Sequence, residues 1–232
     1  MTQFSPPHLA ALAVLFLAAV AAVTLARRHP GAPTDVVARA LAALILAAWI
    51  GEYVADGVRG TWTARYDLPL QLTDAVSVAA AAALLTRRRT AVELTWFWGL
   101  SASLQATLTP DLGQSFPSVY YFTYFGYHVG AVVAALMLVL GCGIYPRPRG
   151  AWRAFGLALC WAALAAVADL ISGANYMYLR FRPAHGSLLS AFGHWPWYIV
   201  GGALVGLAML LVLQWLAQIA ARHDARTAPH AR

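Results

Sequence analysis

Residues 67–85 read DLPLQLTDAVSVAAAAALL, and three arginines follow at positions 87–89. The stretch predicts a membrane helix whose polar side chains gather in its first half. At 100° per residue, four of these side chains share one side of the helix, within an arc of about 160°: Gln71, Thr73, Asp74 and Ser77. An ionised aspartate in hydrocarbon costs about 2.5–3.5 kcal/mol on insertion scales, so we expect Asp74 to face other helices, a partner or a water-filled cavity. This polar face is the first candidate for a functional site.

The composition is that of an integral membrane protein. Of the 232 residues, 61% are hydrophobic and 11% are charged, whereas soluble domains carry about 25% charged residues. The net charge of +7 comes from arginine, without any lysine, and the arginines sit at the ends of apolar segments, which indicates membrane topology rather than nucleic-acid binding. Cys142 and Cys160 lie in or beside apolar runs without metal-ligand spacing, so neither a disulfide framework nor a metal site is indicated.

Seven apolar stretches of about 18–23 residues are each long enough to cross a hydrocarbon core of about 30 Å. They predict an all-α, polytopic protein with a single seven-helix membrane domain over residues 1–221 and a polar C-terminal tail over residues 222–232. The expected helices cover residues 8–26, 36–54, 68–85, 91–108, 118–140 and 151–171, and a seventh begins at Trp195–Tyr198 and ends near Ile219.

The arginines are divided unequally between the two sides of the membrane. If the N-terminus lies outside, twelve arginines fall in the cytoplasmic loops and tail, and only four on the outer side: Arg59, Arg65, Arg180 and Arg182. The positive-inside rule therefore predicts an outer N-terminus and a cytoplasmic C-terminus, in the inner (plasma) membrane.

This orientation brings most of the remaining polar residues toward the outer face. They lie at or just after the ends of the fourth and sixth helices, near the start of the fifth, and before the seventh: Gln105, Asp111, His128, Asp169, Asn175, Tyr176 and Trp197. We expect a polar pocket that opens outward and is roofed by the loop after the sixth helix. Glu52 and Asp56, one turn apart, are interpreted either as a helix end paired with Arg59 or Arg65 or as further members of this pocket.

Several segments resemble a known family. LPLQLTDAVS at 68–77, ELTWFWGLSASLQATLTPD at 93–111, His128, ANYMYLRFRP at 174–183 and SLLSAFGHWPWYI at 187–199 are similar to the bacterial YwaF-type integral membrane family. That family is related to a eukaryotic transmembrane family of lipid acyltransferases. The resemblance extends from about the second expected helix onward and implies an enzyme that acts on lipid esters.

The resemblance also implies a catalytic pair. In the eukaryotic relatives a cysteine on the third helix and a histidine on the fifth are held to carry acyl transfer. The family motif commonly reads LPLHLC; here Gln71 stands at the histidine position and Thr73 at the cysteine position, while His128 matches the histidine of the fifth helix. A more distant group of membrane hydrolases of fatty-acid esters is thought to use a threonine and a histidine, so Thr73 is compatible with catalysis.

The implied chemistry is nucleophilic acyl transfer. Thr73 would attack an acyl carbonyl, His128 would accept its proton, and Asp74 or Asp169 would orient the imidazole. Gln71 or Asn175 would donate hydrogen bonds to the oxyanion, where such a donor is worth about 2.7–4 kcal/mol. The expected substrate-binding set is Gln71, Ser77, Gln105, Asp111, Asp169, Asn175, Tyr176 and Trp197, and no cofactor or metal is expected.

Two other functions remain open. One is non-enzymatic binding or transport of a lipid or small molecule, with Asp74 and Asp169 in the pocket. The other is a scaffold in which the polar cluster only joins helices through hydrogen bonds worth about 0.6 kcal/mol each; a threonine inside a helix commonly bonds to its own backbone. In each case membrane lipids are the expected partners and nucleic acid is not, and the oligomeric state is undetermined.

Overall fold

The computed structural model describes residues 1–182 and 191–227, and all regular secondary structure in these residues is helical, with loops between the helices. The first half contains α1 (Pro6–Arg28), α2 (Ala32–Arg59), α3 (Leu72–Thr86), α4 (Arg89–Trp98), the π-helical η1 (Gly99–Ser103) and α5 (Leu104–Leu108). The second half contains α6 (Val119–Leu136), the π-helical η2 (Met137–Gly141), α7 (Gly150–Ser172), the short 3₁₀ helix η3 (Tyr176–Tyr178) and α8 (Trp197–Thr227).

These elements form seven rods, because α4, η1 and α5 are continuous and α6 continues into η2. Five rods are long and apolar enough to cross a membrane, namely α1, α2, α6 with η2, α7 and α8. The all-α class and the membrane class are therefore confirmed. Helix α3 is also apolar but has only 15 residues.

Predicted boundaries differ from the structure by four residues or more in α2, α3 and α8. Helix α2 covers Ala32–Arg59 rather than residues 36–54. Helix α3 begins at Leu72, four residues later than expected, because Gln71 adopts an extended N-cap conformation and its N–H donates to Asp74 Oδ2 at 2.8 Å. Such reciprocal capping satisfies a backbone donor that has no partner inside the helix. Helix α8 continues to Thr227 rather than ending near Ile219, so residues 222–227 of the predicted tail are helical, and residues 228–232 lie outside the described part.

Helix α6 is the centre of the bundle and packs against α1, α2, α3 and η1. Its small residues permit close approach of the neighbouring helices, as is usual where helices associate in membranes. A Cβ atom at Gly126 would lie 2.7 Å from Ala48, and one at Gly130 would lie 2.6 Å from Ile45. These glycines therefore fix the register between α6 and α2.

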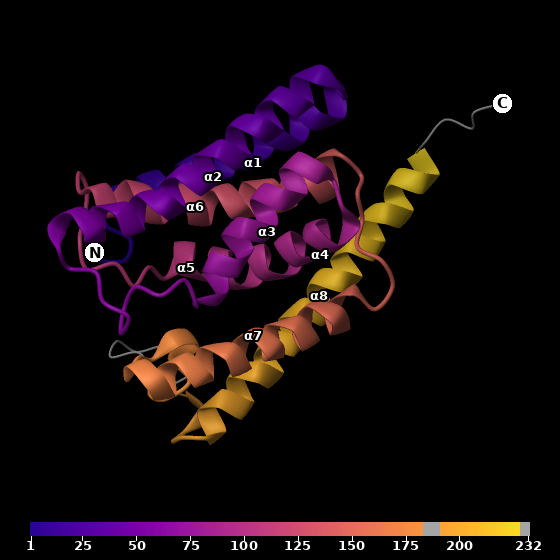
Figure 1. Ribbon diagram of the computed structural model, residues 1–232. Helices are drawn as coiled ribbons and strands as arrows, with labels where there is room; N and C mark the ends of the chain where they lie inside the picture. The colour runs from indigo at the N-terminus through magenta and orange to yellow at the C-terminus, as the bar shows by residue number, and fades with distance from the viewer. Residues whose placement is uncertain (183–190, 228–232) are drawn as a thin grey trace.

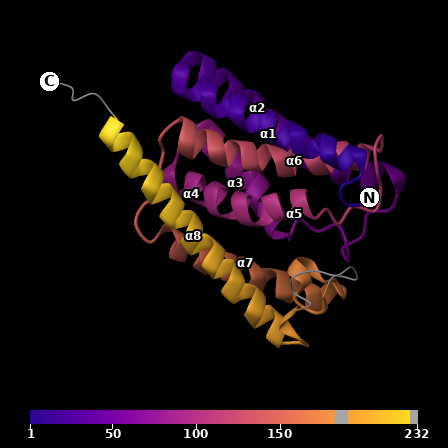
Figure 2. The same cartoon turned by 180° about the vertical axis from the view of Figure 1, so that it is seen from behind.

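Helices α7 and α8 form a pair on the opposite side of α3 and α4 from α1 and α2, and α8 runs obliquely past the other helices (Figures 1 and 2). Large apolar side chains on α8 remain exposed, among them Leu204 at 63% and Trp215 at 59%. An exposed apolar surface of this extent is compatible with lipid and not with water as the surrounding medium.

The bundle has two chemically different ends. We call the end that holds Met1, the start of α3 and the start of α6 the N-terminal end, and the other the arginine-rich end. At the N-terminal end, His8 on α1 bonds to the Thr107 carbonyl at 2.9 Å and the Tyr121 hydroxyl donates to the Pro7 carbonyl at 2.7 Å. At the arginine-rich end, Glu93 receives hydrogen bonds from Arg147 and Arg153.

Candidate functional site

Asp74 joins α3 to α2 at the N-terminal end. Its Oδ1 atom accepts hydrogen bonds from the Trp49 indole and from the Tyr53 hydroxyl, both at 2.8 Å, and its Oδ2 atom accepts the Gln71 N–H. The residue is only 6% exposed. Because both oxygens are engaged by these donors, Asp74 acts as an interhelical lock, and no hydrogen bond joins it to His128 in the described residues.

The partners of Asp74 come from one face of α2. With Glu52 and Asp56, they form one stripe along the helix, because Glu52, Tyr53 and Asp56 follow Trp49 by three, four and seven residues. Glu52 interacts with Tyr127 on α6, and Asp56 accepts a hydrogen bond from Tyr120 rather than pairing with Arg59 or Arg65. The sequence interpretation recognised the two acids of this stripe but missed Trp49 and Tyr53, which the same spacing could have identified.

Thr73 lies at the centre of the buried face of α3. At 100° per residue, the fully buried Ser77, Ala80 and Leu84 fall within about 40° of Thr73, whereas Asp74 is turned about 100° toward α2. Helix α3 packs against α6 and η1 as well as α2 and α4. The half-buried Thr73 side chain is therefore on the inward side of α3, and its carbonyl accepts the Ser77 hydroxyl at 3.0 Å.

His128 is buried in an aromatic layer of α6. It is 2% exposed, and the rings of Tyr124 and Tyr127 lie with their centroids 4.3 Å from its own. Tyr124 is held by a hydrogen bond from its hydroxyl to the Ala106 carbonyl at 2.9 Å. The Nδ1 atom of His128 is buried and has no hydrogen-bond partner among the described residues, so packing rather than a carboxylate holds the imidazole.

The loop after α7 is tied to the start of α3, as the expected roof requires. The Gln71 side-chain oxygen accepts the Met177 N–H at 3.0 Å, and the Tyr176 hydroxyl accepts the Leu68 N–H at 2.7 Å. Asp169 Oδ1 accepts the Tyr176 N–H at 2.7 Å, while Asn175 accepts the backbone N–H groups of residues 180–181. These four residues position the loop and the N-terminus of α3.

The remaining expected residues do not converge on one point. Asp111 accepts the Tyr178 hydroxyl at 2.8 Å, which anchors η3 to the segment after α5. Burial, with the added effect of this hydrogen bond, holds the pKa of Tyr178 above its ordinary value. Gln105 is exposed and donates to Thr109 Oγ1 at 2.7 Å. Trp197 is 68% exposed, and Ser77 is buried and bonded to its own helix.

An apolar cavity of about 280 Å³ adjoins the start of α3. Leu72, the neighbour of Thr73, lines it together with Trp98 and Ser101, with η3 and with the facing sides of α7 and α8. Small residues on those two helices, including Ala158 and Gly206, create the space. The cavity is close to the lower limit of the roughly 300–1,000 Å³ found for small-molecule sites, and its walls suit part of a hydrocarbon chain.

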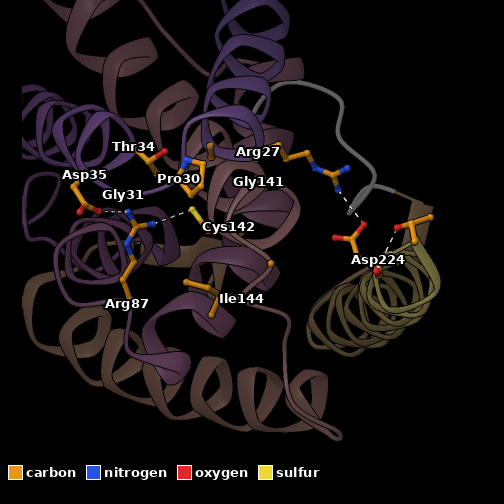
Figure 3. A pocket seen from close by; sticks show the side chains of 13 residues that line it. Arg27, Pro30, Gly31, Thr34, Asp35, Arg87, Gly141, Cys142, Ile144 and Asp224 are labelled. Carbon is orange, nitrogen blue, oxygen red and sulfur yellow. Dashed lines mark hydrogen bonds and ion pairs between the residues drawn. The ribbon is translucent and has the colours of Figure 1, made fainter. Parts of the chain in front are cut away.

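A second pocket, of about 570 Å³, lies at the arginine-rich end (Figure 3). Arg87 contacts Asp35 at 3.2 Å and the Cys142 sulfur at 3.1 Å, and Arg27 contacts Asp224 at 3.4 Å. The two arginines are thus balanced by two acids. The pocket lies at the C-terminal end of α3, whereas Thr73 lies at the start of that helix, so it is separate from the candidate site.

Comparison with known proteins identifies one relationship. The sequence profile of the TMEM164 family matches residues 3–214. No curated protein and no solved structure matches the chain significantly. The matched region includes both Thr73 and His128 and extends from the residues before α1 into α8.

Proposed function

The chain belongs to the TMEM164 family, a family of transmembrane proteins, and on this premise we propose that it is an acyltransferase or esterase of membrane lipid esters. Thr73 is the nucleophile and His128 is the base in this proposal. The proposal retains the relationship to the YwaF-type bacterial proteins that the motifs around both residues indicate.

The position of Thr73 is the observation that supports the proposal most. Thr73 is on the inward side of α3, and that side packs on α6, the helix that carries His128. Its neighbour Leu72 lines the apolar cavity between α7, α8 and η1. In this proposal an acyl chain in the cavity carries its ester group at the start of α3, where Thr73 follows Leu72.

The local backbone favours an oxyanion beside Thr73. Thr73 is the second residue of α3, and the N-terminus of a helix presents unpaired N–H groups and a partial positive charge. These groups stabilise the oxygen of a tetrahedral intermediate in the manner of an oxyanion hole. The side-chain amide of Gln71 adds a donor, because the hydrogen bond from Met177 engages only its oxygen.

The reaction proceeds in two steps with conserved atoms and charge. Thr73 Oγ attacks the carbonyl carbon while His128 takes the hydroxyl proton, and the ester C–O bond then breaks as His128 returns the proton to the departing alcohol. The resulting acyl-threonine is attacked by an acceptor hydroxyl or by water, from which His128 removes the proton. The bond between the acyl carbon and Thr73 Oγ then breaks as His128 returns this proton to Thr73 Oγ. A transferase and an esterase differ only in this second nucleophile.

The proposed topology is seven membrane spans with an outer N-terminus, in the inner (plasma) membrane. The arginine distribution supports it, because Glu93, Arg147 and Arg153 lie at the end assigned to the cytoplasm. Labelling of single introduced cysteines at residues 2 and 227 with a membrane-impermeant maleimide in intact cells tests this orientation. We expect reaction at position 2 only; reaction at position 227 alone reverses the topology.

Covalent labelling tests the enzymatic function. The protein in lipid nanodiscs is treated with an alkyl fluorophosphonate or an activated acyl ester and analysed by intact mass and peptide mapping. We expect one adduct, on Thr73, that Thr73→Ala and His128→Ala abolish. Thr73→Cys restores the residue of the family motif and should react faster with the activated acyl ester, because a thiol is the stronger nucleophile toward an acyl carbon.

Ser101→Ala is the matched control for this experiment. Ser101 lines the same cavity, but its hydroxyl donates to the Phe97 carbonyl at 2.6 Å, so its removal should leave the adduct unchanged. An adduct elsewhere, or none in folded protein, contradicts the assignment of Thr73.

Lipid binding without chemistry is the second candidate, and the apolar cavity is the observation that favours it. A binding protein predicts that Thr73→Ala still retains lipid and is still stabilised by it. An enzyme predicts that Thr73→Ala retains lipid but loses the adduct and turnover. Transport through Asp74 is disfavoured, because its carboxylate is engaged by Trp49, Tyr53 and Gln71.

A further inference from the structure

Two buried polar atoms on facing helices have no hydrogen-bond partner among the described residues. One is Ser103 Oγ, on the π-helical η1, and the other is His128 Nδ1, on α6. The two residues are 1% and 2% exposed. Buried polar groups are nearly always satisfied by protein or by ordered water, so each such atom requires an explanation.

The packing of η1 and α5 on α6 places these residues at the same level. A Cβ atom at Gly99 would lie 3.3 Å from the Ala131 carbonyl oxygen, and farther along the rod the Tyr124 hydroxyl donates to the Ala106 carbonyl. Because the two rods are antiparallel, Ser103 falls between these contacts on one rod and His128 falls between them on the other.

The acids at this end of the bundle have other partners. Asp74 is bonded to Trp49, Tyr53 and Gln71, and Glu52 interacts with Tyr127. Asp169 accepts the Tyr176 N–H through Oδ1, while its Oδ2 has no partner among the described residues. Each of these bonds has a structural role at its own helix or loop. The arrangement therefore differs from a triad in which a carboxylate holds the imidazole.

We propose that Ser103 is the positioning residue of His128, acting through one buried water molecule that links Ser103 Oγ to His128 Nδ1. The Nδ1–H group donates to the water, and the water donates to Ser103. This bond fixes the neutral tautomer that leaves Nε2 as the acceptor, since the hydrogen bond at one ring nitrogen decides the state of the other. An internal water makes two to four such bonds and is costly to remove.

The Ser103 hydroxyl differs from those of the neighbouring residues. A hydroxyl in a helix commonly donates to the carbonyl four residues earlier, as Ser101 does within the same π-helical turn and Thr107 does in α5. Ser103 ends η1 and makes no such bond. Single-turn π segments are frequent at functional sites, and this one leaves a hydroxyl free at the level of His128.

The role of the pair in acyl transfer rests on the proposed function, but the link itself is testable without it. The test is ¹⁵N NMR of the histidine rings in ¹⁵N-histidine-labelled protein in nanodiscs, with His128→Gln to assign the signal. We expect the wild-type protein to show neutral His128 with the proton on Nδ1. Protonation on Nε2 in the wild-type protein overturns the proposal without any variant.

Substitutions at Ser103 give the second readout. Ser103→Ala should replace the single tautomer with a mixture, Ser103→Thr should restore it, and Ser101→Ala is the matched control that should leave it unchanged. If the His128 signals are the same in folded Ser103→Ala and wild-type protein, the proposal is wrong. If Ser103→Ala does not fold, the proposal is still tested by the tautomer of His128 in the wild-type protein and in Ser103→Thr, which should both carry the proton on Nδ1.

Labelling separates this proposal from the proposed function. If both hold, Ser103→Ala should slow formation of the Thr73 adduct by about 10- to 100-fold, a part of the 10²–10⁴-fold that a positioned base contributes. A tautomer that depends on Ser103 without any adduct on Thr73 supports the link and contradicts the enzyme. If the Thr73 adduct forms but the His128 tautomer is the same in Ser103→Ala and wild-type protein, the result supports the enzyme and contradicts the link.

Discussion

The indole N–H of Trp49 on α2 donates to Asp74 Oδ1 on α3 at 2.8 Å. Tyr53 donates to the same oxygen from one turn farther along α2. These bonds set the rotation of α3 about its axis, because they hold Asp74 against α2. That rotation turns Thr73 toward the interior of the bundle.

Removal of this lock should destabilise the bundle in graded steps. Trp49→Phe and Tyr53→Phe each delete one interhelical hydrogen bond, which we expect to cost about 0.6–1.7 kcal/mol in a membrane protein. Asp74→Ala leaves several buried donors unpaired, each at a cost of about 1–3 kcal/mol, and should be the most harmful. Thermal unfolding in nanodiscs measures the order. The exposed Tyr66 provides the control Tyr66→Phe, and equal stability of all four variants would contradict the lock.

Substitutions in the ion-paired cluster around Glu93, at the arginine-rich end, should lower the free energy of unfolding in a definite order. Its carboxylate is 3% exposed and accepts from both Arg147 and Arg153, whose side chains are about 40% exposed. Loss of one arginine leaves the other as a partner, so Arg147→Ala and Arg153→Ala should each lower the free energy of unfolding only slightly. Loss of both leaves a buried, unpaired charge and should cost about 3–5 kcal/mol.

The loss of stability in Glu93→Ala should lie between that of the single and that of the double arginine variants, because the two freed arginines can be hydrated. Denaturant unfolding of the single and double variants measures the order. A double arginine variant that is no less stable than Glu93→Ala would contradict a buried, ion-paired carboxylate.

The contact between Tyr145 and Asp224 should make α8 sensitive to alkali. Burial, with the added effect of the hydrogen bond to Asp224, raises the pKa of Tyr145 to about 12 from an ordinary value near 10. The protonated phenol is favoured in the folded state, so its stabilisation is complete below pH 10 and is lost as the pH rises from about 10 to 12. A spin-label distance between α1 and the end of α8 should lengthen over this interval.

Tyr145→Phe is the control for this alkaline transition. The variant lacks the ionisable hydroxyl, so its distance should not respond between pH 10 and 12. An identical profile in both proteins would assign the transition to another group, such as Tyr178, whose pKa is also raised.

Filling the apolar cavity should reduce lipid binding without loss of folding. A Cβ atom at Gly206 meets no atom within 4 Å, and Gly206 lines the cavity, so Gly206→Leu adds bulk where there is room. Native mass spectrometry of protein with a fatty-acyl ester should show weaker retention of ligands with longer chains.

Gly156→Leu is the matched control for the cavity variant. Gly156 is an exposed glycine of α7 with equally open surroundings, but it is not among the residues that line the cavity. We expect unchanged retention. Equal effects of the two variants would show that the cavity does not hold the chain.

The amino-acid sequence by itself determined the positions of the seven rods and the polar face of α3. Hydropathy and helical periodicity are local properties, and a segment that crosses lipid must satisfy its backbone internally by forming a helix. Helical periodicity also placed Thr73 and Asp74 on one face of α3, whereas the catalytic pair of Thr73 and His128 came from the family resemblance. The predicted α2 and α8 were too short. The predicted start of α3 was too early, because the capping by Asp74 depends on a single hydrogen bond.

Only the tertiary structure decided which polar groups meet across helices. The bond of Asp74 to Trp49 and Tyr53 rather than to His128 depends on the rotation and register of α2, α3 and α6. Close contacts at Gly126 and Gly130 set that register, and a shift of one residue turns a helical side chain by 100°. The unpaired hydroxyl of Ser103 likewise lies on η1, a π-helical segment that packs on the helix of His128 and that hydropathy does not encode.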